Sequence, residues 1–256
     1  MRSQQAARTA LVAVILSSLP LLGHALTVDA TAQEKPALSP ISLQQMTPEQ
    51  RGDLLMIHQQ YMEAVDAYRQ GPRDSAVRWN KLGMAYHHLF ALEEAKMDYE
   101  RALHLNPKYG EALNNLGAVY YSEKDYQRAE KLYHRALKLI PSSATTYNNL
   151  GTAYFADGKF KQGAAAYRAA FAIDPKVFSG DPMQTISEAS STAERARVNF
   201  CLAELYAQAG MTDQAIEYLR RAINAGFNDN KRLMQDQVFA SLRQTPEFAH
   251  LVAMAK

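Results

Sequence analysis

Cysteine is nearly missing from this sequence. The chain has 256 residues and one cysteine, Cys201, so an intrachain disulfide is excluded and cysteine usage says nothing about the redox compartment. An excess of charge of either sign is also missing, because 28 Lys and Arg residues stand against 26 Asp and Glu residues, a net charge of +2. This balance does not favour nucleic acid, and we expect no nucleic-acid partner. Apolar residues make up 47% of the chain, enough for a buried core.

Sequence motifs of catalysis are missing as well. There is no glycine-rich phosphate loop and no G-x-S-x-G element. The seven histidines are scattered, and the adjacent pair His87 and His88 would point about 100° apart on a helix, which does not suit one metal ion. Cys201 falls on a predicted helix, where a buried and inert thiol is expected. The sequence therefore predicts a protein that is not an enzyme and that has neither a metal ion nor a small-molecule cofactor.

A hydrophobic run long enough to span a membrane is also missing. Residues 11–22 (LVAVILSSLPLL) form a run of 12, against the roughly 20 that a spanning helix needs. Basic Arg2 and Arg8 precede this run, and small residues follow it at Ala25 and Ala32, the order typical of a secretory signal peptide. We expect residues 1–32 to be removed and the protein to be periplasmic or secreted. The alternative is an uncleaved signal that anchors the protein in the inner membrane.

A 34-residue repeat dominates the middle of the sequence. Its members occupy equivalent positions in three successive units: Trp79, Leu113 and Tyr147; Leu82, Leu116 and Leu150; Gly83, Gly117 and Gly151; Tyr86, Tyr120 and Tyr154; Ala95, Ala129 and Gly163; Tyr99, Tyr133 and Tyr167; Ala102, Ala136 and Ala170; Pro107, Pro141 and Pro175. The spacings within a unit place these residues on one face each of two helices, with small residues where the helices approach. Each proline follows the second helix, which it cannot continue. One such pair cannot bury its own apolar face, but stacked pairs can.

This pattern of W-x-x-L-G-x-x-Y, then A-x-x-x-Y-x-x-A and P, resembles the tetratricopeptide repeat (TPR). The resemblance implies an all-α fold, a right-handed TPR superhelix (an α-solenoid) of antiparallel helix pairs with N- and C-terminal capping helices. The expected organisation is as follows: 1–32 signal peptide, 33–47 flexible linker, 48–75 capping helix or degenerate half-repeat, 76–177 three TPR repeats, 178–195 insertion, 196–229 a fourth, divergent repeat, and 230–256 C-terminal capping helices. We expect 49–70 to be one long helical stretch.

The family resemblance also implies which residues meet a partner, because the first helix of each pair lines the concave groove. The predicted groove residues are Asn80, Asn114 and Asn148 at the fifth position, Asn115 and Asn149 at the sixth, Met84 and Thr152 at the ninth, and His87, Tyr121 and Phe155 at the twelfth. An amide both donates and accepts hydrogen bonds, so a row of asparagines could pair with the backbone of an extended peptide. Alternatively, asparagine at the sixth position has a structural role in this repeat.

The predicted function is a protein–protein interaction module of the cell envelope, which binds an extended peptide or partner protein in the groove. Some members of the family hold a chaperone's C-terminal carboxylate with lysine at the fifth position and asparagine at the ninth. Here Asn80 and Met84 stand at those positions, which argues against that clamp. The alternative function is an accessory or assembly subunit of an envelope or secretion complex. A membrane is expected as a partner only if the signal is uncleaved.

Overall fold

The computed structural model covers the 256-residue chain. Every regular element among the residues that it describes is helical. The structure describes residues 45–178 and 191–255, which belong to one compact unit that begins at Ile41. The predicted signal peptide, nearly all of the linker and most of the insertion lie outside the described residues. Within the described ranges there is no strand, and no helix is long and apolar enough to cross a membrane. The prediction of an all-α fold is confirmed.

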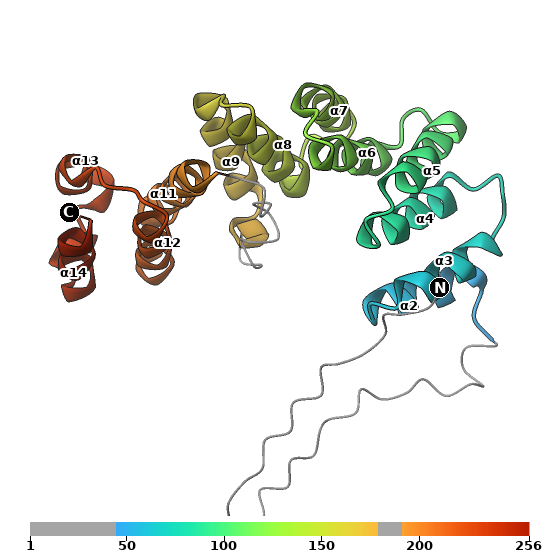
Figure 1. Ribbon diagram of the computed structural model, residues 1–256, viewed down its shortest axis with the longest axis horizontal. Coiled ribbons are helices and arrows are strands. Elements are labelled where there is room, and N and C mark those ends of the chain that lie inside the picture. The colour runs from blue at the N-terminus through green and yellow to red at the C-terminus, as the bar shows by residue number, and fades with distance from the viewer. Residues whose placement is uncertain (1–44, 179–190, 256) are drawn as a thin grey trace, which may run out of the picture. The chain divides into compact units, whose positions relative to one another are not determined.

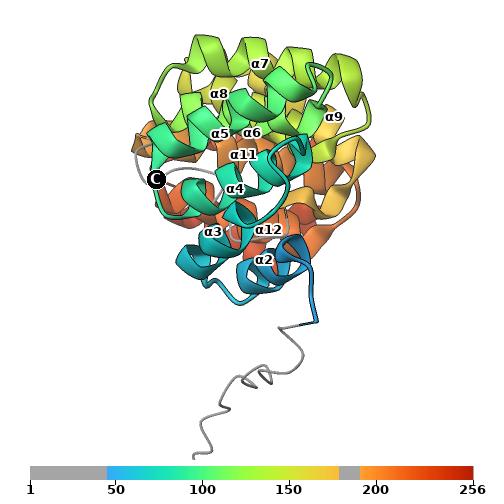
Figure 2. The ribbon, with the colours of Figure 1, turned by 90° about the vertical axis from the view of Figure 1, so that its right-hand side faces the viewer.

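The helices follow one another as pairs, which Figure 1 shows side by side and Figure 2 shows with α2, α3 and α4 toward the viewer. The pairs are α2 (Pro48–Ile57) with α3 (Tyr61–Arg69), α4 (Ala76–His88) with α5 (Leu92–Leu105), α6 (Gly110–Ser122) with α7 (Tyr126–Leu139), α8 (Ala144–Ala156) with α9 (Phe160–Ile173), and α11 (Thr192–Gln208) with α12 (Thr212–Asn224). The remaining elements are η1 (Pro175–Phe178), α13 (Asn230–Gln235), η2 (Gln237–Phe239), η3 (Leu242–Gln244) and α14 (Pro246–Met254). Each second helix from α3 to α7 also contacts the first helix of the next pair, which makes the stack.

Local sequence signals set where these helices begin and end. Ser191 and Glu194 form a capping box at the start of α11, and Thr245 caps α14 with Pro246 in its first turn. In the turn after α6, Lys124 has a positive φ of 63°, and the Asp125 N–H donates to the carbonyl of Tyr120 at 2.9 Å. This is the Schellman arrangement, which satisfies carbonyls that the helix end leaves unpaired.

A tyrosine ring on the second helix packs against a glycine on the first helix in the successive pairs. A Cβ atom added to Gly117 would lie 2.7 Å from Cε1 of Tyr133, and one added to Gly83 would lie 2.8 Å from Cδ1 of Tyr99. The rings of Tyr99 and Tyr133 are each 1% exposed. The glycine is therefore required because the ring occupies the place of a side chain.

The segment 48–75 corrects one expectation. It forms two helices, α2 and α3, instead of one long helical stretch. The chain turns at Gln59, whose φ is 60°, and a Cβ atom on Gly52 would overlap the ring of Tyr68. Gly52 and Tyr68 are 16 residues apart, the same spacing as Gly83 and Tyr99, so this segment is a complete helix pair.

The pair α11 and α12 keeps the packing of the array but changes its residues. Ala203 and Leu219 stand where the earlier pairs have glycine and tyrosine, and both are fully buried. The larger alanine is matched by a smaller partner, so the two helices still pack. After α12 the chain continues as α13, two short 3-10 helices and α14, with Phe239 and Phe248 buried in the same apolar cluster as α11 and α12.

Two charged side chains are buried between α3, α4 and α5. Nε of Arg78 donates to the carbonyl of Tyr68 at 2.6 Å, and Nη2 donates to that of Arg69 at 3.1 Å, which ties α4 to the end of α3. Nη1 of Arg78 and Oδ2 of Asp98 are buried without a hydrogen-bond partner among the described residues. Burial raises the pKa of Asp98 to about 7, although Arg78 and Arg69 oppose the rise and Glu94 adds to it. Repeat two has uncharged Ala112 and Leu132 at these positions, and repeat three has Thr146 and Ala166.

The glycine–tyrosine contact predicts a coupled pair of substitutions. Gly117→Ala should lower the free energy of unfolding by about 1–3 kcal/mol, because the added methyl overlaps the Tyr133 ring. Adding Tyr133→Leu reproduces the Ala203 and Leu219 combination of the last pair. Urea unfolding of the two single variants and the double variant should then show a double-variant loss smaller than the sum of the single losses. Additive losses would contradict the proposed contact.

Buried Asp98 predicts a pH dependence of stability. Since its pKa is raised from 3.8 to about 7, the folded state holds this proton more tightly than the unfolded state. The neutral Asp98 carboxyl makes its full contribution to the free energy of unfolding below about pH 4, and this contribution is lost as the pH rises through about 7. The loss is at most about 4 kcal/mol. Unfolding of wild type and Asp98→Asn between pH 4 and 8 should show a shallower decline in the variant. The exposed control Glu111→Gln should follow wild type, and equal slopes for wild type and Asp98→Asn would contradict the prediction.

Candidate functional site

The first helices of successive pairs contact one another directly, α4 with α6 and α6 with α8. Most of the predicted groove residues lie along this line of contact. We use the name amide face for the half-buried or exposed members, which are Met84, His87, Asn114, Asn115, Tyr121 and Asn149, together with Ala118 at the ninth position of the second repeat.

Asparagines of successive helices hydrogen-bond to each other along the amide face. Nδ2 of Asn115 donates to Oδ1 of Asn80 at 3.0 Å, and Nδ2 of Asn149 donates to Oδ1 of Asn114 at 3.0 Å. Within α6, Nδ2 of Asn114 donates to Oδ1 of Asn115 at 3.2 Å. The sixth-position residue of each helix thus pairs with the fifth-position residue of the helix before it, and the bonds join into one ladder.

Ion pairs extend the ladder from α4 to α2, the first helix of the first pair. Lys81, the sixth-position residue of α4, lies 2.7 Å from Oε1 of Glu49 and 2.7 Å from Oδ2 of Asp53 on α2. Glu49 is the equivalent of Asn80, since it precedes Gly52 by the same three residues as Asn80 precedes Gly83. The sequence reasoning missed Glu49 and Asp53, because it did not recognise α2 as the first helix of a pair. The Gly52–Tyr68 spacing was the signal that could have found them.

The ladder ends at α8. Oδ1 of Asn148 is buried without a partner among the described residues, and Cys201 occupies the sixth position of α11, where a donor would be needed. Cys201 is a buried free thiol, and burial raises its pKa to about 12. It is therefore protonated at neutral pH and fits the expected inert role.

Several predicted groove residues are buried, which differs from the expectation of a solvent-facing row. Asn80 is 4% exposed and Asn148 6%. Thr152 is also buried; its hydroxyl donates to the carbonyl of Asn148 at 3.0 Å and lies 2.9 Å from the hydroxyl of Tyr167. These three residues contribute to the packing between helices, and the continuous row of Asn80, Asn114 and Asn148 is not accessible as a unit.

Phe155 is buried for a reason that lies in its own repeat. Its ring packs on Gly163, where an added Cβ atom would come within 2.7 Å of Cδ2, and its centroid lies 5.2 Å from that of Tyr167. The first two repeats have Ala95 and Ala129 at the position of Gly163. The loss of that methyl lets the aromatic ring turn into the core.

The amino-acid sequence also matches models of a known protein family. Two sequence models of the tetratricopeptide repeat match the chain, one at residues 108–176 and the other at residues 76–109 and 196–225. The chain belongs to the tetratricopeptide repeat family. The TPR matches include the fourth, divergent repeat. A comparison with curated proteins gives no match.

Solved TPR structures resemble the chain in fold. MamA from Desulfovibrio magneticus RS-1 is 19% identical with a TM-score of 0.48, and the match covers 74% of this chain and 96% of that one. YrrB, described as a TPR protein with an unusual peptide-binding site, is 17% identical with a TM-score of 0.46, covering 77% and 91%. PilF from Pseudomonas aeruginosa is 21% identical with a TM-score of 0.40, covering 71% and 76%. The TPR fold supports a protein–protein interaction module, and TPR proteins are generally non-enzymatic scaffolds for protein or peptide partners.

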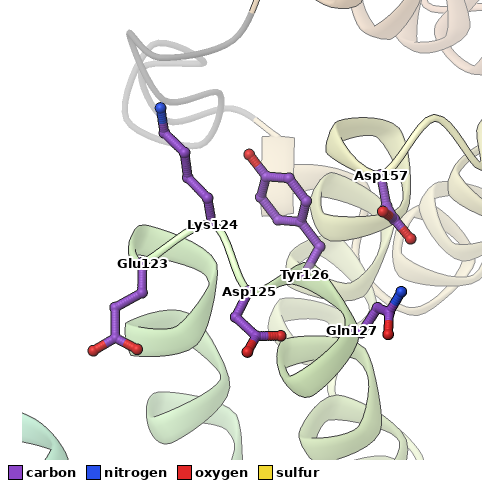
Figure 3. A pocket seen from close by; sticks show the side chains of 6 residues that line it. All are labelled: Glu123, Lys124, Asp125, Tyr126, Gln127 and Asp157. Carbon is purple, nitrogen blue, oxygen red and sulfur yellow. The ribbon is translucent and has the colours of Figure 1, made fainter.

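A pocket of about 390 Å³ lies at the turn between α6 and α7, where the ring of its residue Tyr126 is 5.6 Å from that of Tyr121 on the amide face. It is lined by Glu123, Lys124, Asp125, Tyr126, Gln127 and Asp157, and Figure 3 shows Lys124 and Tyr126 extending to one side of the turn and Glu123 and Asp125 to the other. Its carboxylates already have basic neighbours: Lys96 for Glu123, Arg128 for Asp125 and Lys159 for Asp157. The described residues hold no group of three or more His, Cys, Asp or Glu placed to bind a metal ion.

The ladder predicts that two TPR asparagines differ in their contribution to stability. Asn114→Ala removes two hydrogen bonds and leaves amide atoms of Asn115 and Asn149 unpaired, so it should lower the free energy of unfolding by about 1–3 kcal/mol. Asn148→Ala removes the same atoms at a position where Oδ1 has no hydrogen-bond partner among the described residues, and should cost less. Urea unfolding midpoints of both variants provide the measurement, and an equal or larger loss for Asn148→Ala would show that the ladder does not stabilise the array.

Proposed function

We propose that the chain is a non-enzymatic interaction module that binds an extended segment of a partner protein on the amide face. The observation that carries this proposal is the fixed row of half-buried amides Asn114, Asn115 and Asn149. An amide has two donor hydrogens and two acceptor lone pairs, and the ladder uses only part of that capacity. The remaining donors and acceptors suit the N–H and C=O groups of an extended backbone.

The side chains around the amides favour uncharged partner residues. Met84 is 36% exposed, and Tyr121 adds a half-buried aromatic ring. Burial lowers the pKa of His87, and neighbouring His88 lowers it further, so the imidazole is neutral near pH 7. A partner segment with apolar side chains would therefore lose little on leaving water, whereas a charged side chain would find no counter-charge in this set.

We further propose that residues 1–32 are removed on export and that the module acts in the periplasm or outside the cell. The order of basic, apolar and small residues supports this location. If the signal is instead retained, the protein would be an anchored accessory or assembly subunit of an envelope or secretion complex. Fractionation with an intact-mass measurement of the protein recovered from cells separates the two, because a mass that includes residues 11–22 excludes a cleaved signal.

A peptide-display library tests the binding site. Linear peptides selected on the purified protein should lose affinity by about 10-fold or more for Ala118→Glu, since a charged side chain beside Asn114 and Asn115 blocks hydrogen bonds that contribute about 0.5–1.5 kcal/mol each. Calorimetric titration measures the affinities. Lys231→Glu on α13 is the matched control and should bind as wild type. Failure to select any linear peptide, or unchanged binding by a folded Ala118→Glu variant, would exclude peptide binding on this face.

A further inference from the structure

The most exposed of the large apolar side chains in the described residues lies in the turn between α4 and α5. Phe90 is 86% exposed, and its φ of 57° lies in the left-handed region, which bulky residues rarely adopt. The equivalent turns of the other pairs also have a positive φ, and their residues there are Gln59, Lys124, Gly158 and Gly210. Phenylalanine is therefore unfavourable at this position for two reasons, a strained backbone and an aromatic ring in water, and the core does not require it.

Two more exposed apolar side chains lie at the corresponding turn of the first pair. Ile57 is 76% exposed and Met62 is 58% exposed. The ring of Tyr61, next to Met62, stacks on the ring of His88 with a centroid distance of 4.7 Å and an interplanar angle of 10°. Because His88 is two residues before Phe90, this stack joins the two turns. We call these five residues the tip patch, and a contiguous exposed apolar patch is typical of an interaction site.

The charged residues beside the tip patch are all acidic. Glu63 follows Met62 in the first turn of α3, and Glu93 and Glu94 lie in the first turn of α5, all three exposed. They form no ion pair with the described residues. The two segments that make the turns, 57–66 and 87–95, contain no Lys or Arg. The patch therefore has apolar side chains with unpaired carboxylates at its edge.

The repeat itself does not require these carboxylates. The residues equivalent to Glu93 and Glu94 in the next two second helices are Gln127 and Arg128, and Lys161 and Gln162. The nearest lysine along the chain, Lys96, lies 3.7 Å from Glu123 and so extends toward the following pair. Burial lowers the pKa of His88, which leaves its imidazole neutral near pH 7. Exposed apolar side chains and uncompensated negative charge thus occur together at the first two turns.

We propose that the tip patch binds a segment of a partner protein in which apolar side chains are flanked by Lys or Arg. Phe90, Ile57 and Met62 would lose their contact with water, and the basic residues would pair with the carboxylates at the edge. An anionic membrane is disfavoured because the same carboxylates repel its headgroups. A second copy is disfavoured because a self-complementary contact would place Glu93 and Glu94 of the two copies against each other. No residue of the tip patch belongs to the amide face, so this surface is separate from the proposed peptide site.

A panel of synthetic peptides tests the proposal on the full chain as it is recovered from cells. Each peptide has a short run of Leu, Ile, Val or Phe flanked by lysines, and its matched control has glutamates in place of the lysines. Fluorescence anisotropy at about 50 mM salt should show binding of lysine-flanked peptides and none of the glutamate-flanked ones, with affinity that falls as salt rises. Absence of binding by the lysine panel, or equal binding of both panels, would overturn the proposal.

Phe90→Gly locates the binding site without endangering the fold. Glycine adopts a positive φ without strain, so the variant should unfold at an equal or higher urea concentration than wild type. It should nevertheless bind the lysine-flanked peptides about 10-fold or more weakly, because the exposed ring is lost. Met234→Ser, which removes a 50% exposed apolar side chain on α13, is the matched control and should bind as wild type. Unchanged binding by Phe90→Gly would show that the peptides bind elsewhere.

A charge variant tests the acidic edge. Glu63→Gln, Glu93→Gln and Glu94→Gln together should weaken peptide binding by about 10-fold at low salt and by less at high salt. Glu247→Gln on α14 is the exposed control and should not change it. Equal affinity of the triple variant and wild type would overturn the role of charge. Recruitment of wild type to phosphatidylcholine vesicles, or a doubled mass in sedimentation equilibrium, would also overturn the proposal if Phe90→Gly abolishes it, and would assign the tip patch to lipid or to a second copy.

Discussion

The close approach of two helices at a glycine is the constraint on which the rest of this structure depends. A tyrosine ring fills the space that a side chain on Gly117 would take, and the same contact recurs at Gly83 and Tyr99. Because the ring is buried between the helices of a pair, it fixes how the pair packs and so which residues of the first helix face outward. The last pair, with Ala203 and Leu219, keeps the contact by exchanging volume between the two partners.

The amide ladder gives the stack a second, directional set of contacts. Apolar packing between pairs is tolerant of small shifts, whereas a bond such as Asn115 to Asn80 is made in only one register. The polar residues that hold neighbouring repeats in register are thus also those nearest to the proposed binding face. A partner that bonds to Asn114 or Asn115 would meet groups whose orientation is already fixed, which lowers the entropy lost on binding.

The charges on the outside of the array follow a different logic. The second helices present equivalent positions to solvent, and these positions are free to change sign without disturbing the core. Glu94 and Arg128 show this freedom, since each lies on an exposed face at one position of the repeat. The inner amides and the outer charges therefore provide two surfaces of different chemistry on one scaffold.

The sequence by itself determined the helix pairs, their 34-residue register and the family, because spacing alone states which residues share a helix face. The caps at Ser191 and Thr245 also follow from local sequence signals, namely Glu194 three residues after Ser191 and Pro246 directly after Thr245. Only the tertiary structure decided that 48–75 is a complete helix pair. The 16-residue spacing of Gly52 and Tyr68 identifies the pair because the structure places the Tyr68 ring against Gly52. The burial of Asn80 and Phe155 was also beyond the sequence pattern. Their exposure depends on a neighbouring helix and on the missing methyl of Gly163, and position within a repeat does not specify either one.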